Sequence, residues 1–234
     1  MNKAQEHLYS LAHAQTQLAC IHQLRREPHL AQQYAEMAIA VATEQAFPYR
    51  VADGKILQGW AIAVQGQVED GIQLVHAGLD ICRTMGAMLD YPYFLALLAD
   101  ACSRAGRVDE VLIALAGAQA MVLNSRSFHY EAELHRLKGD LLLQTSGASK
   151  IDDAEACFAE ALAVARRQGA KSLELRAAMS LGRLWQQQGK QAEAHHLVVE
   201  TSSWFTEGFD TVDLQQARAF LQEQEPKERA VSQG

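Results

Sequence analysis

The sequence predicts an all-α protein, a right-handed superhelical solenoid of about five antiparallel helix pairs with a C-terminal capping helix. Three observations predict this fold class. Alanine and leucine recur throughout, while the chain holds only 4 prolines and 7% aromatic residues, and straight-chain residues lose little rotamer freedom in a helix. Landmark residues return about every 40 positions. Between the landmarks, small and apolar residues follow helical spacing, as at Ala154, Phe158 and Ala161.

Two independent landmarks define the repeat. The first is a small residue, and its positions are spaced by 40, 40, 40 and 43 residues: Ala19, Gly59, Ala99, Gly139 and Gly182. The second is a small or apolar residue spaced by 40, 40, 43 and 40: Ala31, Gly71, Val111, Ala154 and Ala194. Both landmarks place the same three-residue insertion in the turn QTSGASKIDD. A fixed period of this length is typical of stacked helix pairs.

Each unit is predicted to be a helix, a turn and a second helix. The small landmark in the first helix lets the second helix approach closely. A glycine then ends the first helix at Gly66, Gly106 and Gly189, because glycine adopts the left-handed C-cap conformation at little cost. An acidic residue near the start of the second helix, such as Asp70 or Glu110, suits the positive end of the helix dipole.

The elements follow one another as a single array over residues 1–225. Its units span about residues 10–46, 50–86, 90–126, 130–168 and 173–207, the capping helix spans 211–225, and a polar tail, 226–234, is expected to be mobile. The stretch WFTEGFDTVDL, residues 204–214, is interpreted as the joint before the capping helix. Gly208 would end one helix and Asp210 would cap the next, with Trp204 and Phe205 packed beneath it. A ligand pocket is the alternative for these aromatic residues.

Charge and composition argue against two kinds of partner, nucleic acid and membranes. A formal net charge of −7 argues against nucleic acid, which requires a basic surface. The apolar runs are far shorter than the roughly 20 residues of a membrane span, so no membrane association is predicted. Four scattered cysteines without a CxxC pair indicate small buried side chains in a reducing compartment. We therefore expect a cytoplasmic protein.

The sequence contains no recognisable catalytic motif. Its nine histidines do not occur at the spacing of an HExxH zinc site, and the chain has neither a GxxxxGK[ST] phosphate-binding loop nor a GxSxG nucleophile elbow. We predict that the protein is not an enzyme, with no catalytic residues, no metal site and no cofactor.

The repeat residues resemble those of the tetratricopeptide repeat (TPR) family. AEACFAEALAVARRQGA matches the AxxxFxxAL pattern of its second helix, and the small landmark matches the eighth position of its first helix. The usual TPR period is 34 residues, so the longer period implies longer helices or links. A narrower resemblance covers about residues 8–222. YFLALLADACSRAGRVDE and WFTEGFDTVDLQQARAFL look like the C-terminal TPR region of large bacterial signalling proteins that carry an adenylate or guanylate cyclase domain and an AAA ATPase domain.

The TPR resemblance implies a concave groove lined by the first helix of each unit. Carried onto this chain, the groove positions that we single out are Trp60, Tyr93, Asp100, Arg104, Glu133, Arg136, Asp140, Arg176, Arg183 and Gln187. Two alternatives stay open at this stage. Trp60 is either exposed as an anchor for a partner or buried within the array. Arg176 and Arg183 either hold a carboxylate of the ligand or pair with neighbouring acids.

The resulting hypothesis is a non-enzymatic scaffold or regulatory module in bacterial signal transduction. It would bind a peptide segment or a neighbouring domain, such as a cyclase or ATPase domain of the same system, with Trp60 and Tyr93 as anchors and arginines that orient acidic groups. The alternative is a small-molecule sensor in which Trp60 stacks on a ring. The sequence leaves the oligomeric state open.

Overall fold

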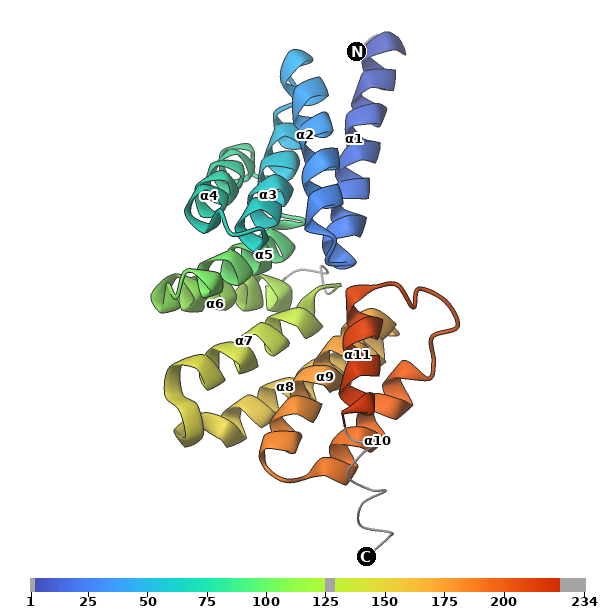
Figure 1. Cartoon of the computed structure of the whole chain (residues 1–234). Helices are drawn as coiled ribbons and strands as arrows, with labels where there is room; N and C mark the ends of the chain where they lie inside the picture. The colour runs from blue at the N-terminus through green and yellow to red at the C-terminus, as the bar shows by residue number, and fades with distance from the viewer. Residues whose placement is uncertain (1–2, 125–128, 224–234) are drawn as a thin grey trace, which may run out of the picture. The chain divides into compact units, whose positions relative to one another are not determined.

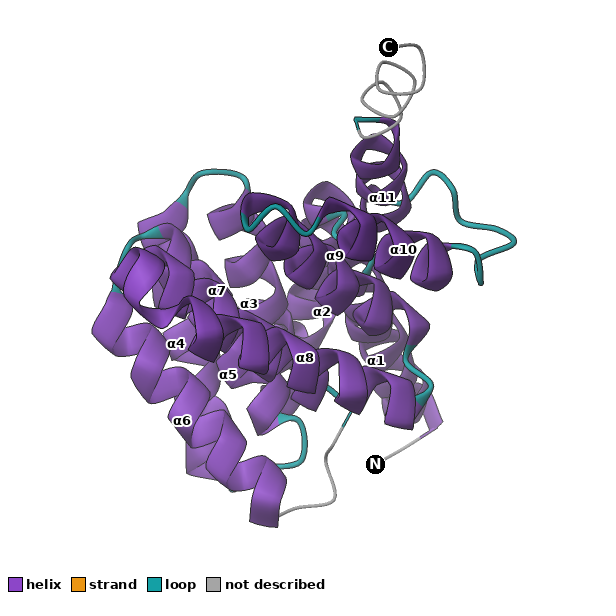
Figure 2. Ribbon diagram, turned by 90° about the horizontal axis from the view of Figure 1, so that it is seen from below, coloured by secondary structure: helices purple, strands orange, loops and turns teal. Residues whose placement is uncertain are grey.

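The computed structural model describes residues 3–124 and 129–223 of the 234-residue chain. Within these ranges all regular structure is helical, with eleven α-helices, one 3-10 helix and no strand (Figures 1 and 2). The contacts divide the chain into two compact units, residues 1–128 and 129–234, which are called unit 1 and unit 2 and are described separately. The predicted fold class, all-α helical repeats, is confirmed. That residues 1–225 act as one array stays a prediction.

Unit 1 consists of three helix pairs joined by short turns. The pairs are α1 (Lys3–Leu24) with α2 (Pro28–Glu44), α3 (Pro48–Val64) with α4 (Val68–Met85), and α5 (Tyr91–Arg104) with α6 (Val108–Asn124). Proline stands in the first turn of α2, α3 and α5, where its missing N–H leaves no hydrogen bond unmade. Helix α3 contacts both α1 and α5. The first helices of the three pairs are therefore neighbours, and they form what we call the odd-helix face of unit 1.

Unit 2 repeats this plan and ends in a single helix. It contains α7 (Glu131–Ser146), a 3-10 turn (Gly147–Lys150), α8 (Ile151–Gln168), α9 (Lys171–Gln187), α10 (Gln191–Ser202) and α11 (Val212–Gln222). Helix α9 contacts α7 and α11, and these three helices form the odd-helix face of unit 2. Leu214, Ala217 and Phe220 of α11 complete a core with Leu175 and Met179 of α9. The predicted tail, 226–234, lies outside the described residues.

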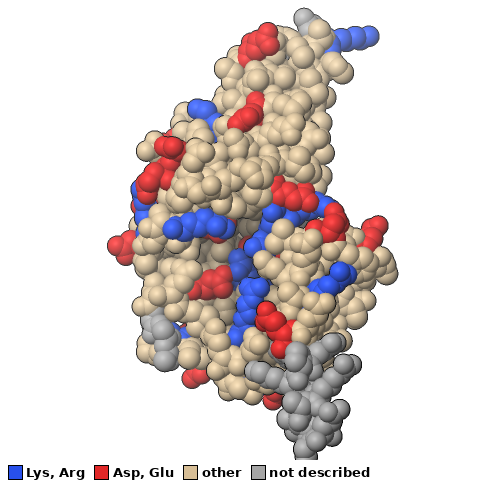
Figure 3. Space-filling view, in the orientation of Figure 1, with Lys and Arg blue, Asp and Glu red and all other residues tan. Residues whose placement is uncertain are grey.

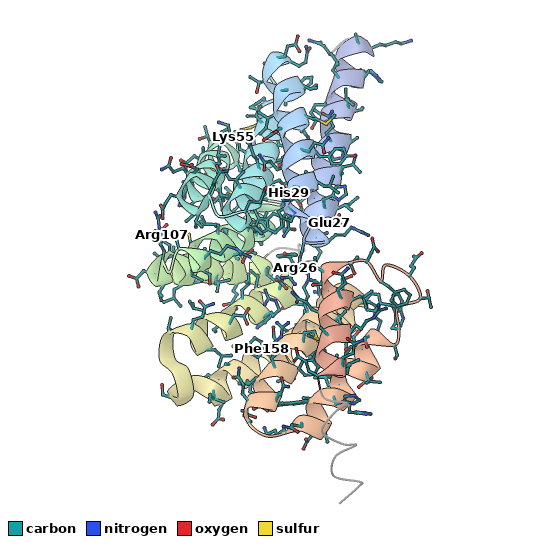
Figure 4. All side chains as sticks on the ribbon, viewed as in Figure 1. Arg26, Glu27, His29, Lys55, Arg107 and Phe158 are labelled. Atoms are coloured by element: carbon teal, nitrogen blue, oxygen red, sulfur yellow. The ribbon has the colours of Figure 1, made fainter. Side chains whose placement is uncertain are left out.

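The small landmarks lie where two helices meet closely. A Cβ atom added at Gly59 would lie 2.5 Å from the carbonyl oxygen of Gly71, and one added at Gly139 would lie 2.5 Å from the ring of Phe158 (Figure 4). Gly66 and Gly106 have φ angles of 102° and 68°, as the C-cap prediction requires. Both physical readings of the repeat, close helix contact and glycine termination, are confirmed at these positions.

The stretch before α11 is a joint, but its details differ from the prediction. Helix α10 ends at Ser202, so Gly208, although its φ is 73°, does not end a helix. The N-cap of α11 is Thr211 rather than Asp210, because an irregular segment of nine residues, 203–211, separates the two helices. Trp204 is 60% exposed and does not pack beneath α11, whereas Phe205 packs as predicted against the core that α11 completes.

No helix in the described ranges is both long enough and apolar enough to cross a membrane.

Candidate functional site

Trp60 joins α3 to α5 on the odd-helix face of unit 1. Its indole Nε1–H donates to Oδ2 of Asp100 over 2.8 Å, and the other oxygen of Asp100 lies 3.5 Å from the Arg104 guanidinium. The structure therefore brings three predicted groove residues together. Trp60 is only 3% exposed, so it takes the buried alternative. The Trp60 ring is therefore not available to anchor a partner, because the neighbouring repeat already removes this large apolar surface from water.

Tyr93, the second predicted anchor, is also internal. It is 5% exposed, and its hydroxyl donates to Oε1 of Gln23 over 2.8 Å and accepts from the thiol of Cys20 over 3.4 Å. These bonds connect α5 to α1. Burial raises the pKa of the Cys20 thiol, although the bond to Tyr93 opposes this rise. Tyr93 thus ties the first and third helix pairs together.

A buried ion pair on α3, between Arg50 and Asp53, was not predicted. Nη1 of Arg50 lies 2.6 Å from Oδ2 of Asp53, and its Nε and Nη2 each donate to the Tyr9 hydroxyl over 3.3 Å. The guanidinium carbon also lies 4.7 Å from the centre of the Tyr49 ring. Arginine and aspartate three residues apart are usual on solvated helix faces, so the sequence carried no signal that this pair would be buried.

The ion pair leaves one carboxylate oxygen unsatisfied. Among the described residues, Oδ1 of Asp53 is buried without a hydrogen-bond partner. Burial raises the pKa of Asp53, the charge of Arg50 opposes this rise and the nearby charge of Asp90 adds to it, so that the pKa lies at about 7. The Tyr49 hydroxyl donates to Asp90 over 3.0 Å. This part of the odd-helix face is therefore sensitive to protonation near neutral pH.

On α7 of unit 2, three predicted residues form one charged cluster. Arg136 donates to both carboxylate oxygens of Glu133, over 2.9 and 2.6 Å, and also pairs with Asp140 one turn later. Such bidentate pairs fix the orientation of the guanidinium. Glu133 is 7% exposed, whereas the side chain of Asp140 remains 35% exposed. Asp140 is thus the member of this cluster most open to a partner.

Arg176 pairs with a neighbouring acid of the same chain. Its Nε lies 2.8 Å from Oδ2 of Asp213 on α11, and both side chains are buried. Burial by itself lowers the pKa of Arg176, but the charges of Glu133 and Asp213 outweigh this effect, and the net shift is upward. Of the two alternatives, the structure shows the internal pair. The sequence could not reveal this contact, because the two residues lie on helices of different repeats.

The last two predicted groove residues are exposed on α9. Arg183 is exposed and donates from Nη2 to the Gln216 side chain over 3.3 Å, and Gln187 is exposed one turn later. With Arg104, whose side chain is 39% exposed, they leave three predicted positions open to a partner. The predicted groove residues therefore include buried side chains, which hold the helices together, and exposed side chains, which a partner could reach.

The described residues hold no group of three or more His, Cys, Asp or Glu side chains arranged as metal ligands. The cysteines at positions 20, 82, 102 and 157 are free thiols.

Part of this chain is similar in sequence to a bacterial protein. No protein-family model matches the chain. An uncharacterized protein of Rhizobium meliloti is 27% identical over 129 residues, which cover 55% of this chain and 12% of that protein. The matched segment is therefore a small part of a much longer relative.

Two crystal structures of TPR-like repeats from Podosopora anserina, described as kinesin light chain repeats, are similar to this chain. The first has a TM-score of 0.51 and 18% identity, and the match covers 87% of this chain and 96% of that one. The second has a TM-score of 0.48, with 18% identity over 89% and 93%. At this identity the first likeness shows the fold alone, namely TPR-like helical repeats.

Proposed function

We propose that this protein is a non-enzymatic interaction scaffold that binds a peptide segment or a neighbouring domain on its odd-helix faces. The observation that carries the proposal is the division of polar residues on these faces. Internal bonds such as Trp60–Asp100 and Arg176–Asp213 fix the helices, while Arg104 and Arg183 extend outward beside them. A rigid repeat surface with pre-oriented arginines suits an extended ligand that carries acidic groups.

The proposed setting is the cytoplasm of a bacterium, where the module would regulate or recruit a signalling domain such as a cyclase or an ATPase. Two points support it. The Rhizobium meliloti relative contains the matched segment within a much longer chain, as expected for one module among several. The scattered free cysteines suit a reducing compartment.

Charge reversal at the exposed arginines tests the proposal. Arg104→Glu in unit 1 and Arg183→Glu in unit 2 should each weaken capture of a partner in a crosslinked pull-down from the source cell. Arg167→Glu on α8 is the matched control, since this residue is also exposed and the substitution changes the net charge equally. Arg136 is a poorer probe, because its reversal would place three acidic side chains together. Unchanged capture by both test variants would refute the mapping.

The alternative function, a small-molecule sensor, is less well supported. A sensor of this kind requires the Trp60 ring to stack on the ligand with an open face, but this side chain is 3% exposed. A thermal-shift screen with metabolites separates the two functions, because a ligand that binds only the native state raises its melting temperature. A saturable rise with one metabolite class, and no protein captured, would favour the sensor.

A further inference from the structure

A chain of polar contacts connects α3 to the start of α5 on the odd-helix face of unit 1. The Arg50 guanidinium donates to Asp53 over 2.6 Å and lies over the Tyr49 ring. The Tyr49 hydroxyl in turn donates to Oδ2 of Asp90 over 3.0 Å. Asp90 is the N-cap residue of α5, but its side chain makes no capping bond, so helix capping does not explain this acid. We call these four residues the Asp53–Asp90 cluster.

The cluster contains two carboxylates and one guanidinium, and its neighbours do not supply the missing positive charge. Helix α1, which packs against α3, has no Asp, Glu, Lys or Arg from His7 to Leu24, and the surface over α1 and α2 in Figure 3 is largely uncharged. Lys55 follows Asp53 by two residues and therefore lies on a different side of α3. Arg83 of α4 is paired with Asp80 over 2.8 Å. The cluster thus has a formal excess of one negative charge.

One oxygen of the cluster lacks a donor. Asp53 is 6% exposed, and among the described residues its Oδ1 is buried without a hydrogen-bond partner. A buried acceptor without a donor costs free energy, and a positive charge nearby reduces that cost. Asp90 is only half-buried, so it is the carboxylate that a ligand reaches. The cluster therefore suits a ligand group that is positively charged and donates hydrogen bonds.

We propose that the Asp53–Asp90 cluster binds a lysine or arginine side chain of the peptide ligand, with Asp90 as the contacting residue. This inference rests on the proposed function, in which Arg104, at the other end of α5, orients an acidic group of the same ligand. The 14 residues between Asp90 and Arg104 correspond to about 21 Å of helix. An extended peptide covers this distance in about six residues. The ligand of unit 1 therefore carries a basic and an acidic residue about six positions apart.

Fluorescence anisotropy with labelled synthetic peptides and the full chain tests the inference. The probe has a lysine and a glutamate separated by five prolines, a spacer that holds the two residues about 19 Å apart. At pH 8, above the pKa of Asp53 of about 7, this carboxyl group is largely ionised. The probe should bind about fivefold more tightly than a peptide with glutamine in place of lysine. It should also bind more tightly than a peptide with one proline between the two charges.

Charge exchange between protein and peptide identifies the contact. Asp90→Lys should lose the preference for the lysine probe and instead prefer a probe with glutamate in place of lysine, whereas a chain that had lost its fold would bind neither. The matched control is Asp109→Lys on α6, where the native residue is exposed, and it should keep the lysine preference. The inference is overturned if the lysine probe binds no better than the glutamine probe, or if Asp90→Lys still prefers lysine.

The pull-down from the source cell separates this inference from the proposed function. Arg104→Glu and Asp90→Lys should both weaken capture of a partner that binds unit 1. Loss of capture with Arg104→Glu alone would leave the proposed function standing and overturn the inference of a basic ligand residue. Capture that is weakened neither by these two variants nor by Arg183→Glu would refute both.

Discussion

Replacing Gly59 with alanine should destabilise unit 1, whereas the same substitution at Gly117 should stabilise it. A Cβ atom at Gly59 would lie 2.5 Å from the Gly71 carbonyl oxygen and 2.9 Å from the Val75 amide nitrogen. Both atoms belong to the backbone, so they cannot move away without shifting α4. At Gly117 the nearest atom is the Cδ1 of Leu95 at 3.4 Å, which is ordinary contact. The two sites therefore differ in space while sharing a helical backbone.

The expected changes in the free energy of unfolding follow from two opposing effects. Alanine gains about 0.5–1 kcal/mol over glycine inside a helix because less backbone entropy is lost. At Gly117 we expect this gain alone. At Gly59 overpacking costs about 1–3 kcal/mol, toward the upper end because the obstacles are backbone. The net loss is about 1–2 kcal/mol, and the two variants should differ by about 2–3 kcal/mol.

Urea unfolding measures this difference. Both sites lie in unit 1, so the same cooperative transition reports them, even where two units unfold separately. The buried Trp60 can follow unit 1 alone by fluorescence once Trp185 and Trp204 are replaced by phenylalanine. If Gly59→Ala proved as stable as the parent chain, or as stable as Gly117→Ala, close approach of the helices would not be the reason for the small landmark.

Three further predictions concern the polar bonds. Asp213→Ala should destabilise unit 2 by about 1.5–3 kcal/mol because the buried Arg176 loses its hydrogen bond to a charged partner, whereas Arg176→Met combined with Asp213→Leu should recover most of this loss in thermal unfolding. The raised pKa of Asp53, about 7, means that the folded state holds a proton which the unfolded state releases near pH 4. The stability of the wild type relative to Asp53→Asn should therefore fall as pH rises from about 4 to 7, by at most about 1.4 kcal/mol per pH unit, and a rise in urea titrations would contradict this. Trp60→Phe should cost about 1–2 kcal/mol, since it removes the donor to Asp100, and an unchanged urea midpoint would show that this bond contributes nothing.

The fold was predictable because helix contact leaves a mark in the sequence at regular intervals. Gly59 and Gly139 are small since a neighbouring helix occupies the space of a side chain, and Gly66 and Gly106 adopt a conformation that other residues avoid. These constraints are local and recur with the repeat. The joint before α11 was predicted less well, because nothing repeats there and the irregular segment 203–211 follows no helical spacing.

The candidate site was predicted only in part. The repeat identified which residues lie on the odd helices, and Trp60 and Asp100, at equivalent positions of successive units, do meet. Whether a side chain on an odd helix is exposed depends on how the next odd helix covers it. The 40-residue period of the sequence does not show this. Trp60 and Arg176 are buried for this reason. The pair of Arg50 and Asp53 was missed because its spacing is the same as that of a solvent-exposed ion pair.

Site-specific photo-crosslinking in the source cell tests the proposed scaffold function most directly. A photoreactive residue would replace Arg104 or Gln187, one on the odd-helix face of each unit, and in matched controls Ile113 of α6 or Arg167 of α8, which are exposed. We predict that one or both odd-face positions form a discrete adduct with a protein and that the control positions do not. Adducts of equal yield from the controls, or none from the odd-helix faces, would contradict the account.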